Sequence, residues 1–520
     1  MKHAKIPVML GTLITIFVLF VLPAAAQQSC ESLMAVKIPN VTITSATAGE
    51  PGFELPAQTG FMNVPARNIP VPFCRVQAWS APTPDSHIGI EVWLPDAANW
   101  NGNFLASGNP GFIGSMPSSG LVNIMERGFV AGGTDTGHVD EGFEWAIGHP
   151  EKWVDWGHRA VHEMVVVTRQ LTESYYGKPA KHSYWDSCHN GANQGLNEAQ
   201  RYPGDFDGIV AADPAFHISH LQAGSLYISW VALKDGVDGP GYIPPAKLAV
   251  INRAALDACD ANDGLVDGLI NYPPSCKFDP AAIRCHGPDA PSCLTDAQVD
   301  TVRKIYAGAK FKDGTQIYSG FERGSELNWN LMIEKEPFFV NLAYFKGMVF
   351  EDPDWDFRRF DVDRDTRRAE AKTGAAVDGN NPDLRPFKQA GGKILLVSSW
   401  NSTGLPPRSI SEYYRSVEKI MGGPGKTQDF ARLFQVPGSG GCPGFLRNTQ
   451  DFDAFGALQQ WVEQGRAPEK IIYSHRSGGI SSQGEVYRTR PVCAYPKQAR
   501  YNGNGDLNDA DNFTCVAREK

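Results

Sequence analysis

The sequence predicts an α/β fold in which a largely parallel sheet is interrupted by a long insertion. Strand-like and helix-like segments alternate over residues 100–216, which is typical of a parallel sheet with helices on its faces. A strand, a sharp turn and a helix follow one another over 181–216, in the layout of a nucleophile elbow. After a long stretch without this rhythm, the buried strand GGKILLVSSW (391–400) resumes the sheet.

Length, composition and charge narrow the class of protein. The chain has 520 residues, of which 42% are hydrophobic and 20% are charged, as in a globular protein with a large core. Its formal net charge of −9 argues against nucleic acid as a partner, because such a partner requires a clustered basic face.

The N-terminus has the pattern of a secretory signal peptide, predicted over residues 1–26. Lys2 and Lys5 precede an apolar run at 6–22, and three alanines at 24–26 fit a small-residue cleavage site. An uncleaved membrane anchor is the alternative, but the run is short for a membrane span. We therefore expect a secreted or periplasmic protein without membrane contact after cleavage.

Ten cysteines in an exported chain indicate five disulfides. Spacing alone favours three close pairs, Cys259–Cys276, Cys285–Cys293 and Cys493–Cys515, and leaves the connectivity open. The other four cysteines are Cys30, Cys74, Cys188 and Cys442. Glycosylation sequons occur at Asn40, Asn401 and Asn512, and they matter only in a host that glycosylates.

The order of patterns along the chain predicts two regions. FCRVQAWS (73–80) and IGIEVWLP (88–95) alternate as strands do, and 161–176 has helical spacing. Residues 217–388 have no βαβ rhythm and carry many prolines and aromatic patches. We predict an α/β core over 27–216 and 389–520, with 217–388 inserted as a lid domain.

Several specific stretches indicate the family. They are TDTGH (134–138), WAIGHPEKWVDWGHRAVHE (145–163), EAQRYPGDFDGIVAADPA (198–215), CDANDGLVDGLI (259–270), RLFQVPG (432–438) and RPVCAYPKQARYNGNGDLNDADNFTC (490–515). Over nearly all of the mature chain they resemble the tannase and feruloyl esterase family, which includes the hydrolase of mono(2-hydroxyethyl) terephthalate. The resemblance implies a secreted α/β-hydrolase fold with a large inserted lid and a serine esterase activity. It also implies the pairs Cys30–Cys74 and Cys188–Cys442, the second of which would tie the elbow to the loop of the catalytic histidine.

The family's catalytic triad is absent when it is carried over residue by residue. The family's Gly-Cys-Ser-x-Gly-Gly reads SCHNGA here, so His189 stands at the serine position. Ser402 stands at the acid position, and Gly441 stands at the histidine position. Acyl transfer requires a nucleophile, a base and a group that orients the base, so the family mechanism does not follow from this sequence. No residue is assigned as catalytic by that mechanism.

The oxyanion hole is also incomplete by sequence. The backbone N–H of Asn190 follows the elbow tip and is a candidate donor. A second donor would come from the glycine-rich turn at 108–114, but Pro110 within that turn has no N–H.

Three functional interpretations follow. The first is a non-hydrolytic scaffold that binds a phenolic or aromatic ester beneath the aromatic lid. The second is an ester hydrolase with relocated residues, in which His189 and Ser402 form a base–nucleophile pair. The third is a non-hydrolytic enzyme that uses His189 as acid–base. Polar residues that family members with a normal triad also carry are interpreted as structural; they are Asp135, His138, Asp155 and His162.

The resemblance also implies a calcium site in the lid. Three carboxylates, Asp260, Asp263 and Asp267, lie in a glycine-containing loop that suits a hard cation. The carbonyls of Leu265 and Leu269 would complete the site. Calcium here would be structural, and no other cofactor is expected; the alternative is an Asp/Gly-rich turn without an ion. The sequence leaves the oligomeric state open.

Overall fold

The computed structural model describes most of the chain. The described residues are 1, 27–57, 66–112, 114–139, 142–443, 451–477 and 484–518. The predicted signal peptide therefore lies outside the described residues, apart from Met1. Within these ranges, no helix has the length and apolar character needed to cross a membrane.

In the described part of the chain, nine strands form one central sheet in the order β1-β4-β5-β7-β6-β8-β9-β12-β13. The strands are β1 (Val41–Gly49), β4 (Phe73–Ser80), β5 (Ile88–Pro95), β6 (Phe104–Ala106), β7 (Val130–Thr134), β8 (Ser183–Cys188), β9 (Gly208–Ala212), β12 (Lys393–Ser399) and β13 (Ala431–Val436). From β1 to β7 the pairing is antiparallel, and from β7 to β13 it is parallel. The prediction of a largely parallel sheet is thus correct for the half that carries the elbow.

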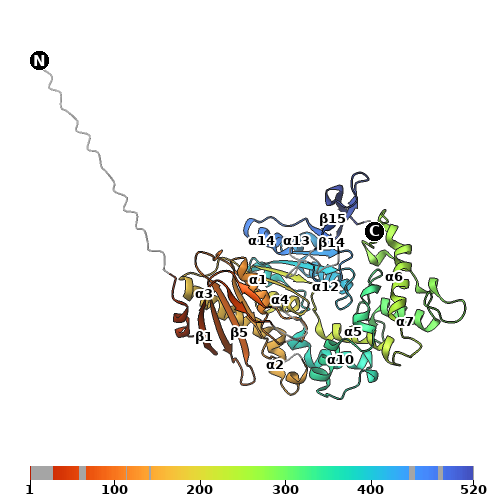
Figure 1. The fold of residues 1–520 in the computed structure, drawn as a ribbon, viewed down its shortest axis with the longest axis horizontal. Helices are drawn as coiled ribbons and strands as arrows, with labels where there is room; N and C mark the ends of the chain where they lie inside the picture. Colours follow the sequence, from red (N-terminus) through yellow and green to blue (C-terminus); the bar gives the residue numbers. More distant parts are fainter. Residues whose placement is uncertain are drawn as a thin grey trace.

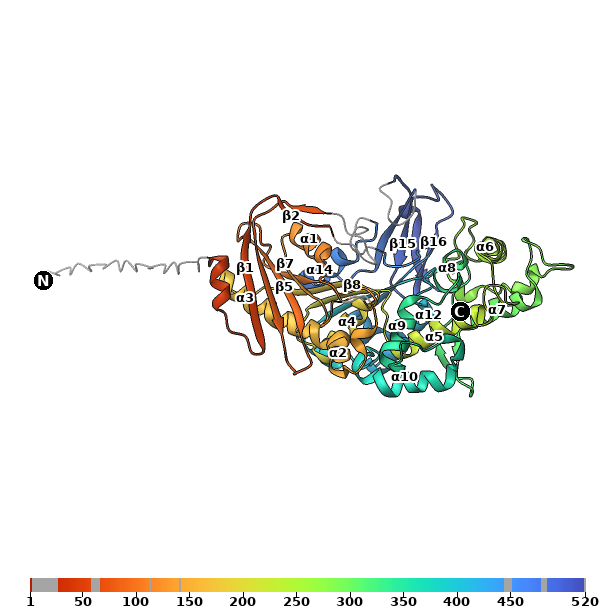
Figure 2. The same ribbon diagram turned by 60° about the horizontal axis from the view of Figure 1, so that its bottom comes forward.

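Helices cover both faces of this sheet, and side chains that alternate along β8 show why. Trp185 packs into the cluster on one face and Tyr184 into the cluster on the other, and both are fully buried. The first face is covered by α3 (Ala160–Tyr176), α4 (Asn190–Arg201) and α12 (Pro407–Met421), and the second by α1 (Ser118–Glu126) and α14 (Ala454–Gln464) (Figures 1 and 2).

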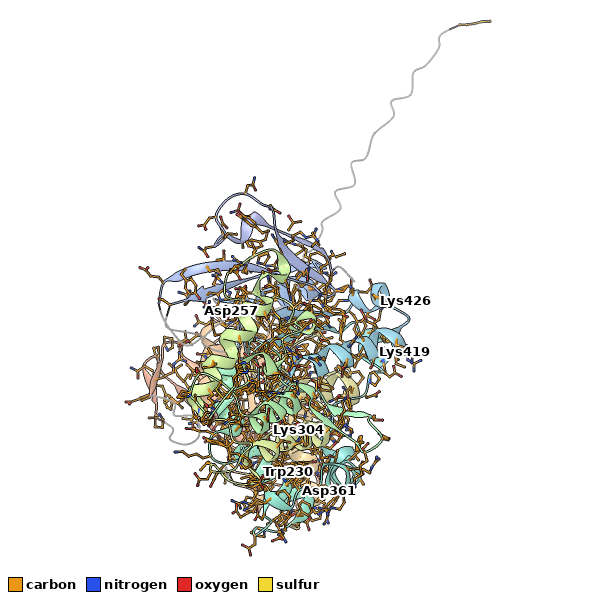
Figure 3. All side chains as sticks on the ribbon, turned by 90° about the vertical axis from the view of Figure 1, so that its right-hand side faces the viewer. Trp230, Asp257, Lys304, Asp361, Lys419 and Lys426 are labelled. Carbon is orange, nitrogen blue, oxygen red and sulfur yellow. A yellow bond between two sulfur atoms is a disulfide. The ribbon has the colours of Figure 1, made fainter. Side chains whose placement is uncertain are left out.

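The segment between β9 and β12 is mostly helical and has a hydrophobic cluster of its own. Its helices are α5 (Ile218–Leu233), α6 (Pro245–Cys259), α7 (Asp296–Ala307), α8 (Asn330–Ile333), α9 (Phe339–Tyr344), α10 (Val362–Val377) and α11 (Arg385–Gln389), with the hairpin β10 (Ala309–Lys310) and β11 (Gln316–Tyr318). Helices α6 and α7 lie at the end of the molecule opposite β1 (Figures 1 and 2). Figure 3 views this end, where Asp257 marks α6 and Lys304 marks α7. The division into a core and a lid domain stays a prediction; we call residues 217–388 the lid segment.

Smaller elements complete the described chain. They are β2 (Phe53–Leu55) paired with β3 (Arg67–Ile69), α2 (Pro150–Val154), α13 (Pro424–Gln428), β14 (Lys470–Arg476) paired with β15 (Val486–Cys493), and β16 (Lys497–Tyr501) paired with β17 (Phe513–Ala517). The last two hairpins are not predicted by the sequence patterns, because strands such as KQARY are only partly buried and lack apolar alternation.

All ten cysteines lie in the described ranges, and they form five disulfides. The pairs are Cys30–Cys74, Cys188–Cys442, Cys259–Cys276, Cys285–Cys293 and Cys493–Cys515. These are the three pairs favoured by spacing and the two implied by the resemblance.

Candidate functional site

The three positions that replace the triad meet at the carboxyl ends of parallel strands. His189 follows β8, and Ser402 and Gly441 lie in the loops after β12 and β13. A Cβ atom built on Gly441 would lie 3.7 Å from Nε2 of His189, and all three residues line one cavity. The fold therefore brings together the positions that the sequence singled out, as expected for a parallel sheet.

His189 occupies the tip of a sharp strand-to-helix turn. Its backbone has φ 55° and ψ −120°, a strained conformation for a residue with a side chain. Helix α4 begins at the next residue, Asn190, and this geometry is that of the nucleophile elbow predicted from 181–216.

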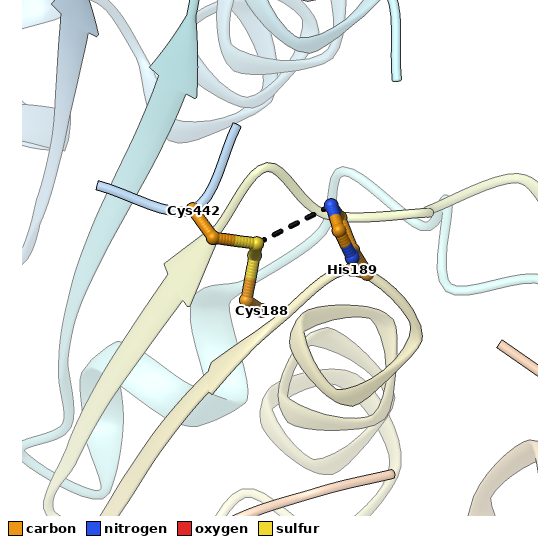
Figure 4. A group of neighbouring side chains, drawn as sticks. All are labelled: Cys188, His189 and Cys442. Atoms are coloured by element: carbon orange, nitrogen blue, oxygen red, sulfur yellow. Dashed lines mark hydrogen bonds between the residues drawn. A yellow bond between two sulfur atoms is a disulfide. The ribbon is translucent and has the colours of Figure 1, made fainter. Parts of the chain in front are cut away.

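A disulfide joins the elbow to the loop after β13. The α-carbons of Cys188 and Cys442 are 5.8 Å apart, and Nε2 of His189 lies 3.2 Å from Sγ of Cys442 (Figure 4). The bond fixes the separation of the two loops whose residues would act together in a triad.

Asp213, which was not singled out by sequence, links the end of β12 to the loop after β13. Its buried carboxylate accepts hydrogen bonds from the backbone N–H of Ser399 at 2.7 Å and the Ser399 hydroxyl at 2.8 Å. It also accepts the backbone N–H of Cys442 at 2.7 Å. Burial raises the pKa of Asp213 to about 6, although these three donors oppose the shift. Its position directly after β9 was the only signal in the sequence.

The environment of His189 favours the neutral form of its imidazole. Its ring is exposed to the cavity, and partial desolvation by the surrounding protein atoms lowers its pKa to about 4. Among the described residues, no serine hydroxyl and no carboxylate forms a hydrogen bond with this imidazole. The base–nucleophile pair of His189 and Ser402 is therefore not formed in this structure.

The turn expected to supply a second oxyanion donor directs its first amides elsewhere. The N–H of Gly108 donates to Oγ of Ser187, and the N–H of Asn109 donates to Oε1 of Gln194. Pro110 and Gly111 reach the cavity, and residue 113 of this turn lies outside the described residues.

The cavity itself has a volume of about 540 Å³, which is a size typical of small-ligand sites. Its walls are mainly apolar; they include Trp156, Ile218, Leu221, Leu331, Phe338, Val340 and Leu405. Three buried amides in this lining have atoms without a hydrogen-bond partner in the described structure, namely both ends of Asn190, Oε1 of Gln222 and Nδ2 of Asn341. An unpaired buried amide is costly, so these three residues of the lining are candidates for polar contact with a ligand. Sequence reasoning missed all three side-chain amides, and it singled out Asn190 only for its backbone N–H.

The polar residues interpreted as structural lie outside the cavity lining. Asp135 accepts the backbone N–H groups of Gly89 and Gly137, and burial raises its pKa to about 6. His138 stacks on Trp145, with its Nε2 2.9 Å from the carbonyl oxygen of Phe112.

Asp155 and His162 likewise have local partners. The Asp155 carboxylate pairs with Arg159, and Nδ1 of His162 lies 2.6 Å from Oδ2 of Asp205. The ligand atoms of His162 and Asp205 lie within 4.8 Å of the carboxylate of Glu198, a grouping that can hold a metal. Burial and the neighbouring Asp205 raise the pKa of Glu198 well above its usual value.

The loop of the expected calcium site is held by its own aspartates. Asp260 accepts the N–H groups of residues 267 and 268, and Asp263 accepts the N–H of Leu265. Asp267 pairs through Oδ2 with Arg490 at 2.8 Å, whereas its Oδ1 is buried and has no partner in the described structure. An orphaned carboxylate oxygen in a loop of oxygen donors suits a hard cation. The three aspartates are nevertheless not among the described groups whose ligand atoms lie within 4.8 Å of one another, and Arg488 also lies 3.7 Å from Oδ2 of Asp267. Leu265 and Leu269, whose carbonyls are the further expected ligands, lie in the same loop.

The mixed sheet, the strained turn after β8 and the cavity at the strand ends define a protein of the α/β-hydrolase fold. The family model described as tannase and feruloyl esterase matches residues 74–516. The chain belongs to the tannase and feruloyl esterase family.

Relatives and solved structures agree with this assignment. An uncharacterized esterase of Xanthomonas campestris pv. campestris is 35% identical over 548 aligned positions, covering 95% of this chain and 92% of the relative. A probable feruloyl esterase B-2 of Aspergillus oryzae is 31% identical, covering 92% and 94%. The crystal structure of feruloyl esterase B from Aspergillus oryzae is similar with a TM-score of 0.86 at 27% identity, covering 94% of this chain and 99% of that one.

Proposed function

We propose that this protein is a member of the tannase and feruloyl esterase family that binds a phenolic or aromatic ester without hydrolysing it by a Ser-His-Asp triad. The observation that carries the proposal is the convergence of His189, Ser402 and Gly441 on one cavity in the places of the nucleophile, acid and base. None of these side chains can play its position's part in acyl transfer. The relatives are named esterases. In this proposal the chain shares their fold and differs from them in its chemistry.

The cavity supports an aromatic ester as the ligand. Its apolar walls suit a ring, and the free amide atoms of Gln222 and Asn341 offer partners to a hydroxyl or a carbonyl. The neutral His189 at the elbow adds no charge that would select an acid over its ester.

The experiment is binding of methyl ferulate by calorimetry, with chromatography of the ligand afterwards. We expect binding with recovery of intact ester, and Gln222→Leu or Asn341→Leu should weaken binding about fivefold, the effect of one neutral hydrogen bond. Gln459→Leu, on the exposed side of α14, is the matched control and should bind as the native chain does. Absence of binding, or release of ferulate and methanol, would contradict the proposal.

A second candidate is an acid–base reaction without hydrolysis. It is favoured by the strained backbone of His189, because such strain clusters at functional sites, and by the exposure of its ring to the cavity. A rearranged ligand in the same chromatogram, lost in His189→Ala, would support this candidate over simple binding.

We also propose that the protein is exported and that its lid segment binds calcium through Asp260, Asp263 and Asp267. Five disulfides support an oxidising compartment, and the orphaned Oδ1 of Asp267 supports the ion. Calcium in this loop would hold the lid segment and take no part in chemistry at the elbow.

A further inference from the structure

A second cavity, of about 700 Å³, lies where the lid segment meets α12 and the C-terminal end of the chain. Both ribbon views place the C-terminus beside the lid helices (Figures 1 and 2). The lining contains six cationic side chains, namely Lys277, Arg303, Arg323, Arg408, Arg415 and Arg518, and one carboxylate, Asp279. A surplus of positive charge in one cavity of a chain with net charge −9 indicates selection for an anion.

Only part of this charge is neutralised by the protein. Arg303 pairs with Asp279, and Arg408 pairs with the buried Glu322. Among the described ion pairs, none includes Lys277, Arg323, Arg415 or Arg518.

The hydrogen-bond donors of these arginines are also incompletely used. Arg323 donates through Nε to the carbonyl of Phe278, and Arg415 donates through Nε to the carbonyl of Ser411. The Nε atoms of Arg408 and Arg518 are buried without an acceptor in the described structure. Burying a guanidinium without a counter-charge is unfavourable, and burial accordingly lowers the pKa of Arg518. An anion in the cavity would relieve this cost.

Aromatic rings determine the shape of the binding surface. The guanidinium of Arg518 lies 3.7 Å from the ring centroid of Tyr272, and that of Arg323 lies 4.4 Å from the ring centroid of Tyr306. Trp400 and Tyr495 add two further rings to the lining. A stacked guanidinium keeps its edge free for bidentate contact with a carboxylate, while aromatic faces accept a flat ring.

We propose that this cavity is a binding site for organic carboxylates that carry a ring, and that it is distinct from the cavity at the elbow. The shared chemistry is a carboxylate on a ring whose face can stack on an aromatic side chain, which a free phenolic acid and a uronate sugar both present. The two cavities have no lining residue in common. They nevertheless share a loop, since Trp400 lines one cavity and Ser402, two residues later, lines the other.

The test is calorimetric titration of the full secreted chain with ferulate, its neutral methyl ester and an oligomer of galacturonate. We expect at least one of the two acids to bind, with affinity that falls as salt rises. Arg323→Gln and Arg518→Gln should each weaken that binding about tenfold or more, as expected for the loss of a charged hydrogen-bond donor. Arg253→Gln is the matched control, because Arg253 is an exposed arginine on α6 outside the cavity.

The ligands distinguish phenolic acids from uronates, and the variants distinguish this cavity from the cavity at the elbow. Binding of ferulate alone assigns the site to phenolic acids, and binding of the galacturonate oligomer alone assigns it to uronates. The proposal is overturned if neither acid binds, or if the bound acid is insensitive to both arginine variants. It is also overturned if acid binding is lost in Gln222→Leu and kept in both arginine variants, because the acid would then occupy the elbow cavity. Two arginine variants are used so that misfolding of one, detected by circular dichroism, leaves the other as the test.

Discussion

At the carboxyl end of β9, Asp213 connects two segments that lie far from it and from each other in the sequence. Its carboxylate accepts backbone N–H groups of Ser399 and Cys442, which flank the positions where the family has its acid and its histidine. No cation pairs with this carboxylate in the described structure, so its charge rests on hydrogen bonds alone. Asp213 therefore positions the site, while its burial without a cation disfavours the ionised form of its own carboxyl group.

Asp213→Asn should change the pH dependence of stability in a defined direction. Because the folded pKa is raised from 3.8 to about 6, the native chain holds its full contribution below pH 3.8 and loses it as the pH rises through about 6. Relative to the variant, the native free energy of unfolding should fall by about 3 kcal/mol between those limits. Urea unfolding at several pH values measures this difference.

The control for that series is Ser399→Ala, which removes one donor and keeps the ionisable group. It should keep a pH dependence of the same sign as the native chain and extend it to higher pH, because the hydroxyl that it removes lowers the pKa of Asp213. A difference between native protein and Asp213→Asn that stays constant with pH would contradict the assigned shift.

Residues of the site could be predicted from the sequence where strand order alone decides their place. His189, Ser402 and Gly441 each follow a parallel strand, so their convergence is predictable. Asn190, Gln222 and Asn341 could not be predicted in this way. Their role depends on which atoms remain unpaired after the lid segment packs over the sheet, and no local pattern encodes that.

At the scale of elements, the Cys188–Cys442 disulfide joins β8 to the loop after β13 across a separation of 254 residues. Replacing both cysteines by alanine should lower the free energy of unfolding by about 5 kcal/mol, because a long loop is closed. The matched variant at Cys285 and Cys293 opens a loop with a separation of only 8, and it should cost about 2.5 kcal/mol. Chemical unfolding under oxidising conditions measures both, and equal losses would contradict this ordering.

The loop after α6 gives a prediction for calcium. At 100 times its dissociation constant, calcium should raise the free energy of unfolding by about 2.7 kcal/mol, and a chelator should reverse the effect. Asp263→Asn should abolish the response, while Asp257→Asn, an exposed residue of α6, should keep it (Figure 3). Thermal unfolding with metal analysis is the measurement. An unchanged melting temperature with calcium would show that the loop is an Asp/Gly-rich turn without an ion.

Elements with strong periodicity were predictable, and those without it were not. The strands β4 and β5 and the helix α3 fall where alternation or helical spacing predicts them. The hairpins β14–β15 and β16–β17 escape prediction because packing against β13 and the Cys493–Cys515 bond stabilise them in place of an apolar pattern.

In the molecule as a whole, the interactions that stabilise the fold are separate from the side chains that decide the chemistry of the site. The sheet, the disulfides and the Asp213 hydrogen bonds hold the geometry in which relatives carry a triad, while the side chains at the three positions are those of His189, Ser402 and Gly441. A scaffold of this kind should regain esterase chemistry when the side chains are restored, apart from a strain cost at Gly441, whose φ is +148°.

The most direct measurement compares hydrolysis of methyl ferulate and a nitrophenyl ester by three purified proteins. They are the native chain, the variant His189→Ser/Ser402→Asp/Gly441→His, and the matched variant with alanine at 189 and the other two changes retained. We expect no turnover above background by the native chain and by the alanine variant. The variant with the restored triad should hydrolyse the esters about 100-fold faster or more. Turnover by the native chain that is lost in His189→Ala would contradict the account and assign catalysis to the elbow as it stands.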